Sequence, residues 1–376
     1  MFPLPRIFAL RWRIVSSLAC VVLAGCASSL EPQASNTSTA DAAWLAGADV
    51  SALPVFESRG ARYSAKGRSG DALEILRDAG VNCFRVRLFV APDGEGIVTN
   101  DLDYTVRLAK RIKATGAKLL LDIHYSDTWA DPGKQFKPAA WENLGFDELV
   151  EKVGSYTREV LARFAAEGAT PDIVQIGNEI TKGLLWPDGR IEYAERERDA
   201  ETWPKLARLL RAGLEAVPTG PGAPQRMIHI ECTGNLPRTR WYLNHLRAEN
   251  LHFDLLGLSY YPEWHGTLAD LRETLSGIAE EFRLPVVVVE TAYPWKHDEH
   301  FDGKENLVFP FTPAGQKAFL ADVAAAVRAT PHGLGRGVVY WHPEVVPVRD
   351  LNIWIGGSCA LFDERGELLP AAAQLR

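Results

Sequence analysis

The sequence predicts a single (β/α)8 barrel, a TIM barrel of the α/β class. From residue 45 onward, short apolar runs alternate with longer amphipathic runs, the pattern of parallel strands joined by crossover helices. The first run is followed by Ser51-Ala52-Leu53-Pro54, where an open doubly wound sheet would carry a Gly-rich phosphate-binding turn. Polar and aromatic residues gather where six of the runs end, as expected when a site lies at the C-terminal ends of barrel strands.

The expected strands are short and rich in aliphatic residues. They cover Ala46–Val50, Asn82–Phe89, Lys118–Ile123, Ile173–Gly177, Arg226–Ile230, Leu255–Ser259, Val286–Val289 and Gly337–Trp341. The expected helices lie between them and carry apolar residues at helical spacing. They cover Asp71–Ala79, Asp101–Thr115, Phe146–Glu167, Asp199–Ala216, Leu236–Glu249, Leu268–Phe282 and Pro313–Ala329. Gly80 and Gly116 follow the first two helical runs directly and predict their ends.

Composition limits both the class of protein and its partners. Hydrophobic residues make up 47% of the 376 residues, enough for a large core, and we find neither an internal repeat nor a second domain. Basic residues are scattered rather than clustered and the net charge is −7, which argues against a nucleic-acid partner. We expect a monomer. The 11 Trp and 10 Tyr residues either fill the core or stack on sugar faces, and composition leaves both open.

The N-terminal residues predict export rather than fold. Basic residues precede the apolar run Ile14–Leu23, which is too short to span a bilayer, so residues 1–25 are expected to be a signal peptide. Leu23-Ala24-Gly25-Cys26 resembles a bacterial lipobox, in which Cys26 is acylated after cleavage; an ordinary signal peptide cut nearby is the alternative. Residues 26–44 are expected to be a flexible tether, and residues 45–376 the (β/α)8 domain.

The N-terminal residues therefore predict a secreted protein that touches the membrane only through its N-terminal lipid. Ala27, in place of Asp, favours the outer membrane. Cys83, Cys232 and Cys359 remain in the mature chain, an odd number, so at least one has no partner within the chain. Cys83 and Cys232 are expected on strands, where cysteine is most often a small buried hydrophobe.

Two glutamates end the expected fourth and seventh strands and are the candidate catalytic pair. Glu179 follows Ile173–Gly177, and Glu290 follows four consecutive valines. A carboxylate at the end of an apolar strand costs free energy unless it has partners or a chemical role. Either glutamate alone could simply form a salt bridge. Two of them, facing each other across a barrel mouth, match the acid and the nucleophile or base of a glycoside hydrolase.

Polar side chains close to this pair are candidate substrate-binding residues. The amide of Asn178, directly before Glu179, could bind the sugar hydroxyl beside the reacting carbon. Arg85 and Arg87 share one strand face, and at least one could keep the nucleophile ionised. A salt bridge inside the barrel is the alternative for both arginines.

Other candidates come from the remaining strand ends. Tyr260 is a candidate hydrogen-bond donor to Glu290. For the rest, packing in the core is the open alternative to sugar binding, and His229 in particular could be a buried structural imidazole. These candidates are His124, Asp127, Trp129, His229, Trp264, Tyr293 and Trp341.

Seven segments carry a family resemblance that runs from about residue 45 to the C-terminus. They are Gly47–Ser51, Asp122–Gly133, Gln175–Ile180, Gly183–Pro187, Gly257–Pro262, Trp264–Leu268 and Val289–Tyr293. Together they resemble glycoside hydrolase family 53, the endo-β-1,4-galactanases. The resemblance implies a retaining mechanism with Glu179 as acid/base and Glu290 as nucleophile. It also implies the substrate, the β-1,4-galactan of pectin side chains (type I arabinogalactan), which the residue pattern alone does not reach.

The chain departs from the family pattern in two places. Some members hold calcium after strand 7 in a run of Asp-x-Asp-x-His-x-Asn type, whereas this chain has His300–Asn306 there, with Lys304 at a ligand position. Calcium requires several oxygen ligands, so we expect no calcium, no other metal and no cofactor. Members often carry Trp-Glu-Asn before the segment Ala360–Asp363; Gly357-Ser358-Cys359 stands there and changes one edge of the cleft.

Two alternatives to a galactanase stay open. One is a related barrel glycosidase that acts on another β-linked glycan, such as mannan or glucan. The other is a lipid-anchored glycan-binding protein that has lost catalysis. Retention of Glu179, Glu290 and Asn178 argues against the second, because a degenerate binder is expected to lose at least one of them.

Overall fold

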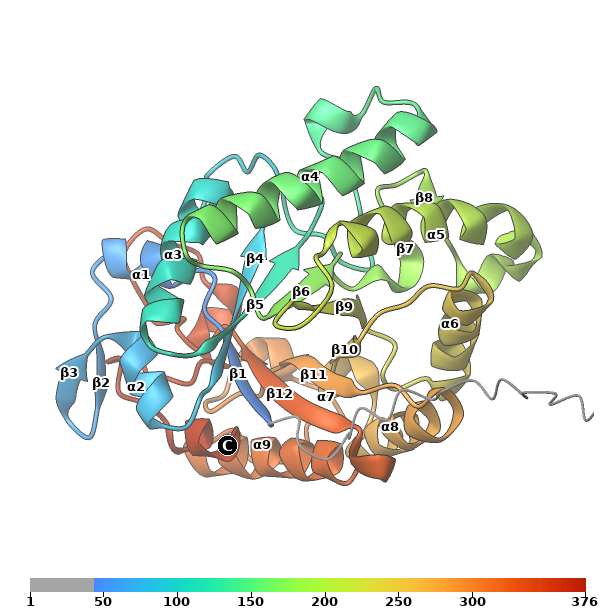
Figure 1. Ribbon diagram of the computed structural model, residues 1–376. Helices are drawn as coiled ribbons and strands as arrows, with labels where there is room; N and C mark the ends of the chain where they lie inside the picture. The colour runs from blue at the N-terminus through green and yellow to red at the C-terminus, as the bar shows by residue number, and fades with distance from the viewer. Residues whose placement is uncertain (1–43) are drawn as a thin grey trace, which may run out of the picture. The chain divides into compact units, whose positions relative to one another are not determined.

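The computed structural model describes residues 44–376, in which eight parallel strands form a closed barrel surrounded by helices (Figure 1). The predicted signal peptide, Cys26 and nearly all of the predicted tether lie outside the described residues. The barrel strands are β1 (Leu45–Asp49), β4 (Cys83–Leu88), β5 (Lys118–Ile123), β6 (Ile173–Ile176), β9 (Gln225–Ile230), β10 (Leu255–Ser259), β11 (Val286–Thr291) and β12 (Gly335–Trp341). The predicted barrel is confirmed, and no expected strand end is more than two residues from the observed one.

The seven expected helices are all present around the barrel. They are α2 (Ala72–Asp78), α3 (Leu102–Ala114), α4 (Phe146–Ala166), α5 (Asp199–Ala216), α6 (Leu236–Ala248), α8 (Leu268–Phe282) and α9 (Pro313–Arg328). Side-chain caps fix several starts; Asp101, for example, accepts a hydrogen bond from the Tyr104 N–H at 2.7 Å. Gly80 and Gly116 follow α2 and α3 with φ of 110° and 74°, so the predicted glycine stops are confirmed. Within residues 44–376, no helix is long and apolar enough to cross a membrane.

Several short elements were not predicted, because they are too short to show a periodic pattern. They include two helices, α1 (Leu53–Ser58) and α7 (Pro262–His265), and two hairpins, β2 (Tyr63–Ala65) with β3 (Arg68–Gly70) and β7 (Gly183–Leu184) with β8 (Gly189–Arg190). In the described chain no α-helix follows β12; the 3-10 turn η8 (Pro370–Gln374) contacts α9 there instead.

Residues inside the barrel change from apolar to charged along its axis. An apolar cluster with members from all eight strands fills the lower interior: Leu45, Cys83, Leu120, Ile173, Met227, Leu255, Val287, Val289 and Val339. Because side chains alternate along a strand, the next inward positions belong to Asp49, Arg85, Asp122, Gln175 and His229, all of them buried. The polar layer therefore lies at the C-terminal ends of the strands, as in other barrels of this kind.

Strand β11 breaks the alternation where it matters most. Val287 and Val289 belong to the interior cluster, so a regular strand would turn Glu290 away from the barrel axis. The pairing with β10 shifts at this point: Val288 is opposite Leu258, but the next residue of β10, Ser259, is opposite Glu290. The pairing with β12 also shifts after Val288. This bulge re-aims Glu290 into the barrel mouth, a common use of bulges next to functional sites.

Candidate active site

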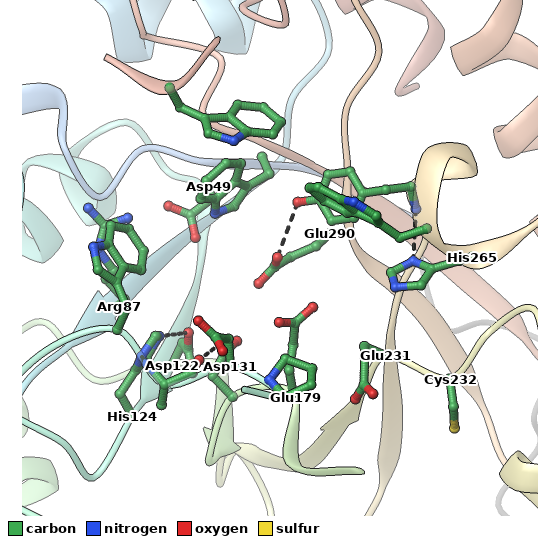
Figure 2. A pocket seen from close by; sticks show the side chains of 18 of the residues that line it. Asp49, Arg87, Asp122, His124, Asp131, Glu179, Glu231, Cys232, His265 and Glu290 are labelled. Atoms are coloured by element: carbon green, nitrogen blue, oxygen red, sulfur yellow. Dashed lines mark hydrogen bonds and ion pairs between the residues drawn. The ribbon is translucent and has the colours of Figure 1, made fainter. Parts of the chain in front are cut away.

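A cavity of about 900 Å³ opens at the C-terminal ends of the barrel strands, and every barrel strand or the loop after it contributes to its wall. Figure 2 shows Arg87 at one end of the cavity and Glu231 and Cys232 at the other. The carboxyl groups of Glu179 and Glu290 point toward each other between these ends. The two predicted catalytic glutamates are thus brought together by the fold.

Arg85 is the centre of a buried charge network beneath the cavity. Its guanidinium contacts three carboxylates: Asp49 at 2.9 Å, and Asp122 and Glu290 both at 2.8 Å. It also donates a hydrogen bond to Oδ1 of Asn178 at 2.8 Å. Arg85 is therefore the arginine that pairs with Glu290, and its donors are occupied by protein groups.

Glu290 is held by a cation on one oxygen and a hydroxyl on the other. Its Oε1 contacts Arg85, and its Oε2 accepts a hydrogen bond from the Tyr261 hydroxyl at 3.2 Å. Burial raises the pKa of Glu290, and the Arg85 guanidinium opposes that rise. Both contacts favour the ionised carboxylate.

The predicted donor to Glu290, Tyr260, is wrong by one residue. The Tyr260 hydroxyl donates to the Gly266 carbonyl at 3.3 Å, and its ring stacks on Phe319 outside the barrel. Neighbouring residues in extended backbone point in opposite directions, so only Tyr261 can face the cavity.

Glu179 lies in a strained turn directly after β6. Its backbone is left-handed, with φ 49° and ψ 51°, which is uncommon for a residue with a side chain. Its Oε1 accepts a hydrogen bond from Ser259 Oγ at 2.6 Å, and no cation pairs with its carboxyl group within residues 44–376. Burial raises the pKa of Glu179 well above its ordinary value, and the negative charges of Glu290 and Glu231 raise it further.

His229 supports this turn from behind and is absent from the cavity wall. Its Nδ1 lies 3.1 Å from the side-chain nitrogen of Gln175, 3.0 Å from Oδ1 of Asn178 and 3.3 Å from the backbone nitrogen of Glu179. Nε2 lies 2.9 Å from Ser259 Oγ, and the Ser259 hydroxyl donates to Glu179. Burial and the charge of Arg85 hold the pKa of His229 well below its ordinary value. The structural imidazole considered above is the arrangement found.

Asn178 lines the cavity, and its orientation is fixed by neighbouring groups. Its Nδ2 donates to the Ala130 carbonyl at 2.9 Å while Oδ1 accepts from Arg85. Gln135, from the loop after β5, donates to the Asn178 carbonyl at 2.7 Å. The left-handed turn at Glu179 is thus supported on both sides.

Arg87 and three tryptophans form an aromatic wall of the cavity. The Arg87 guanidinium lies 4.2 Å from the centre of the Trp129 ring and contacts His342 Nε2 at 3.0 Å. The Trp129 and Trp341 rings meet nearly edge to face at 6.3 Å. Trp354 packs edge to face on Trp341 at 4.7 Å. Flat apolar faces next to charged groups suit the mixed surface of a sugar ring.

Four other predicted binding residues divide evenly between the cavity and the surrounding structure. His124 lines the cavity and contacts Asp122 at 2.9 Å, and Trp264 lies at the rim with 53% of its surface exposed. Asp127 instead accepts hydrogen bonds from loop N–H groups, and the Tyr293 hydroxyl donates to the Phe309 carbonyl at 2.8 Å. Neither Asp127 nor Tyr293 lines the cavity, because each one connects loops behind the wall.

Several cavity residues were not selected from the sequence. Asp49 and Asp122 occupy inward positions at strand ends, and Glu231 follows an apolar strand just as Glu179 does, so a strand-end signal existed for all three. Residues beyond the strand ends, in loops and in the first turns of short or following helices, gave no such signal, because only the tertiary structure brings them to the mouth. These residues are Asp131, Asn235, Arg238, His265, Asn352 and Trp354.

Two histidines of the loop after β11 pair with carboxylates, one in α7 and one in the loop itself. His300 contacts Glu263, and His297 contacts Asp302, each at 2.9 Å. Within residues 44–376, no group of three or more His, Cys, Asp or Glu side chains is arranged to hold a metal ion. Cys83, Cys232 and Cys359 are buried and free; Cys232 lies after β9 rather than on a strand, which corrects its predicted place.

Comparison with known proteins gives concordant matches in sequence and structure. The family model for Glycosyl hydrolase family 53 matches residues 45–375. The chain is 36% identical to an arabinogalactan endo-β-1,4-galactanase A of Aspergillus niger, over 84% of this chain and 88% of that protein. It is 32% identical to an endo-β-1,4-galactanase of Bacillus subtilis, over 87% of this chain and 84% of that protein. The solved GH53 catalytic domain of Ignisphaera aggregans is similar with a TM-score of 0.81 and 32% identity, covering 90% and 97% of the two chains.

Proposed function

The chain belongs to glycosyl hydrolase family 53, and from this premise we propose that it is an endo-acting arabinogalactan β-1,4-galactanase with a retaining mechanism. Two relatives named as galactanases, each aligned over more than four fifths of this chain, support galactan over mannan or glucan. The complete carboxylate pair in the cavity supports an enzyme over a protein that only binds glycans.

The observation that carries the mechanism is the unequal environment of the two glutamates. Glu290 contacts Arg85 and accepts a hydrogen bond from the Tyr261 hydroxyl, and both contacts favour its ionised form. Glu179 has no cationic partner in the described chain, and burial together with the charges of Glu290 and Glu231 raises its pKa, whereas Arg85 opposes the rise at Glu290. Neighbouring carboxyl groups with separated pKa values divide into an acid and a nucleophile.

The reaction then proceeds in two steps. Glu290 attacks the anomeric carbon while protonated Glu179 gives its proton to the leaving galactosyl oxygen, and the glycosidic bond breaks. Once Glu290 is esterified, its negative charge is gone and the pKa of Glu179 falls. Glu179 then removes a proton from water, which attacks the same carbon, releases Glu290 and restores the β configuration.

Two measurements test this proposal directly. Digestion of lupin or potato galactan should give a ladder of galacto-oligosaccharides, which shows internal cleavage; mannan and glucan should stay intact. Proton NMR during the first minutes should show the β-anomer of the new reducing end. First appearance of the α-anomer would contradict the two-step mechanism, and cleavage of mannan or glucan alone would contradict the substrate.

We further propose that the protein is exported and anchored by lipid at Cys26, most consistently at the outer membrane, and acts as a monomer. The support is Leu23–Cys26 and the polar segment after it. A diacylated cysteine supplies two or more chains, enough for stable attachment. Replacing Cys26 by Ala should move activity from the membrane fraction to the soluble fraction. A wild-type protein that is already soluble and begins well downstream of residue 26 would refute the anchor.

A further inference from the structure

His265 lines the cavity, and the protein backbone fixes which of its ring nitrogens carries the proton. It is the last residue of α7, and its Nδ1 accepts a hydrogen bond from the Tyr261 N–H at 3.0 Å. A backbone N–H can only donate, so Nδ1 carries no proton and the proton of the neutral ring lies on Nε2. Burial lowers the pKa of His265 to about 4, which keeps the ring neutral at ordinary pH. His265 is therefore an uncharged side chain that donates through Nε2.

This donor is open to the cavity. The His265 side chain is partly exposed, and its Nε2 has no hydrogen-bond partner among residues 44–376. The atom is also absent from the polar atoms that are closed off inside the described chain. Figure 2 shows the second ring nitrogen of His265 pointing toward the cavity. A molecule in the cavity can therefore reach Nε2 directly.

The neighbouring Trp264 gives the same part of the cavity an exposed apolar face. Its ring lies at the rim and meets the His265 ring nearly edge to face, with 6.5 Å between the ring centres. A pyranose has apolar C–H faces and hydroxyl groups around its edge. An exposed aromatic face beside a fixed N–H donor matches both parts of such a ring.

Both side chains are held in place by contacts of α7 with two other loops. Glu263, the residue before Trp264, pairs with His300 of the loop after β11 at 2.9 Å. The loop after β9 packs on the other end of α7, since a Cβ at Gly234 would clash with the His265 carbonyl oxygen. Groups that are already fixed lose little entropy when they bind a ligand.

His265 lies on the side of the cavity that belongs to the acid. Figure 2 shows it on the same side as Glu231. The charge of Glu231 raises the pKa of Glu179, whereas the charge network around Arg85 acts on Glu290. The acid must lie beside the leaving oxygen, so the sugar attached to that oxygen extends over the side that holds His265.

We infer that Trp264 and His265 bind the leaving sugar: the Trp264 ring packs on one face of the departing galactosyl unit, and Nε2–H of His265 donates to one of its hydroxyl oxygens. The inference rests on the proposed function, because it assumes that Glu179 protonates the leaving oxygen. It assigns to this side of the cavity a preference for a pyranose with free hydroxyls over an aromatic leaving group.

The test compares two leaving groups. Galactan places a sugar beside His265, whereas an aryl β-1,4-galactobioside places only an aromatic ring there. His265→Asn keeps an acceptor at the position of Nδ1 but loses the Nε2 donor. Its kcat/KM on galactan should fall about three- to tenfold, the range for loss of one uncharged hydrogen bond, and on the aryl substrate by less than about twofold.

His265→Gln is the matched control, because it makes the opposite change. It keeps a donor near the position of Nε2 but loses the acceptor for the Tyr261 N–H, so the Tyr261 hydroxyl is held less firmly against Glu290. That loss acts on the nucleophile and should lower kcat/KM by the same factor on both substrates. The ratio of the two values should therefore fall in His265→Asn and stay at the wild-type value in His265→Gln.

A second variant at the exposed rim does not depend on how well the His265 variants fold. Trp264→Ala should also lower kcat/KM on galactan more than on the aryl substrate. The double variant Trp264→Ala/His265→Asn should lose less than the product of the two single losses, because both side chains act on one sugar.

Three results would overturn the inference. They are equal losses on both substrates in His265→Asn, no loss in that variant, and an unchanged ratio in Trp264→Ala. Equal losses would mean that His265 only positions Tyr261 or supports the fold. Failure of wild type to cleave galactan would instead refute the proposed function on which the inference rests.

Discussion

The two catalytic glutamates lie in opposite electrostatic surroundings on the two sides of the cavity. On the Glu290 side, a buried arginine is shared by three carboxylates. On the Glu179 side, the carboxyl group meets one hydroxyl and faces the negative charge of Glu231 without a cation in the described chain. Both glutamates are largely buried and lie at the C-terminal ends of strands of one barrel, so burial alone does not distinguish them. The distribution of counter-charge gives one wall a nucleophile and the other an acid.

This difference also shows how one site can reverse the role of a residue during a cycle. The pKa of Glu179 is raised partly by the charge of Glu290. That charge disappears when Glu290 forms a covalent bond, and no permanent cation holds Glu179 in a single protonation state. The permanent charge of Arg85 keeps the nucleophile Glu290 ionised. The charge of Glu290, which is lost when it is esterified, lets Glu179 change from acid to base.

Removal of the nucleophile should have the largest effect. Glu290→Ala should lower turnover of galactan by about 10⁴-fold or more, the scale seen when a covalent catalyst is deleted. Azide should restore part of the turnover and give a product of inverted configuration, because the vacated space admits a small anion. Substantial activity without azide would contradict the assignment.

Removal of the acid should depend on the leaving group. Glu179→Ala should lower kcat on galactan by about 10²- to 10⁴-fold, the usual contribution of general acid catalysis. An activated aryl galactobioside hardly needs the proton, so its first step should be much less affected. Pre-steady-state measurement of aryl release separates the two steps. Equal losses on both substrates would rule out Glu179 as the acid.

Replacing Arg85 by Lys should change the pKa of Glu290 and leave that of Glu179 in place. Arg85→Lys keeps a positive charge but loses the fork that joins Asp49, Asp122 and Glu290, and should cost about ten- to a hundredfold in kcat/KM. With fewer hydrogen bonds to its carboxylate, the pKa of Glu290 rises, and the acidic limb of the kcat/KM profile moves to higher pH. Arg87→Lys serves as control, because no contact joins Arg87 to Glu290; its acidic limb should stay in place. If the basic limb moved instead of the acidic limb, Arg85 would be acting on Glu179 rather than on Glu290, and the assignment would be contradicted.

Removing the Ser259 hydroxyl beside Glu179 should lower activity less than Arg85→Lys does. It should move the basic limb of the kcat/KM profile rather than the acidic limb. Ser259 donates to Glu179 and stabilises its ionised form, so Ser259→Ala raises the pKa of Glu179. Glu179 must be protonated in the first step; the basic limb of kcat/KM should therefore move to higher pH. Activity at the optimum should fall about two- to tenfold with the loss of one positioning hydrogen bond. A shift of the basic limb to lower pH would contradict this role.

Metal removal should have the smallest effect of all. The loop after β11 places Lys304 among its acidic residues, and His300 and His297 already pair with Glu263 and Asp302. Prolonged treatment with a chelator should change neither melting temperature nor activity. A large fall in melting temperature that calcium reverses would show that this loop binds the ion.

Much of the site follows from the sequence because a barrel turns strand ends into neighbours. Once eight strands are predicted, any polar residue that ends an apolar strand is expected at one mouth, and this located Glu179, Glu290, Asn178 and Arg85. The same rule is too coarse to give side-chain direction. It favoured Tyr260 over Tyr261 and placed Tyr293 in the site, although Tyr293 bonds to a carbonyl behind the wall.

The barrel, the positions of its strands, the candidate catalytic pair and the family can all be predicted from the residues alone, since each depends on local pattern or on recognisable strings. The tertiary structure alone decided which way the decisive side chains face. Regular alternation from Val287 and Val289 would turn Glu290 outward, and only the shifted pairing of β11 with both neighbouring strands brings it inside. Likewise, the left-handed turn at Glu179 depends on groups that are distant in the chain, such as Gln135 and His229. Strand register and loop support are set by contacts between separate segments, and these contacts leave no periodic trace in the sequence.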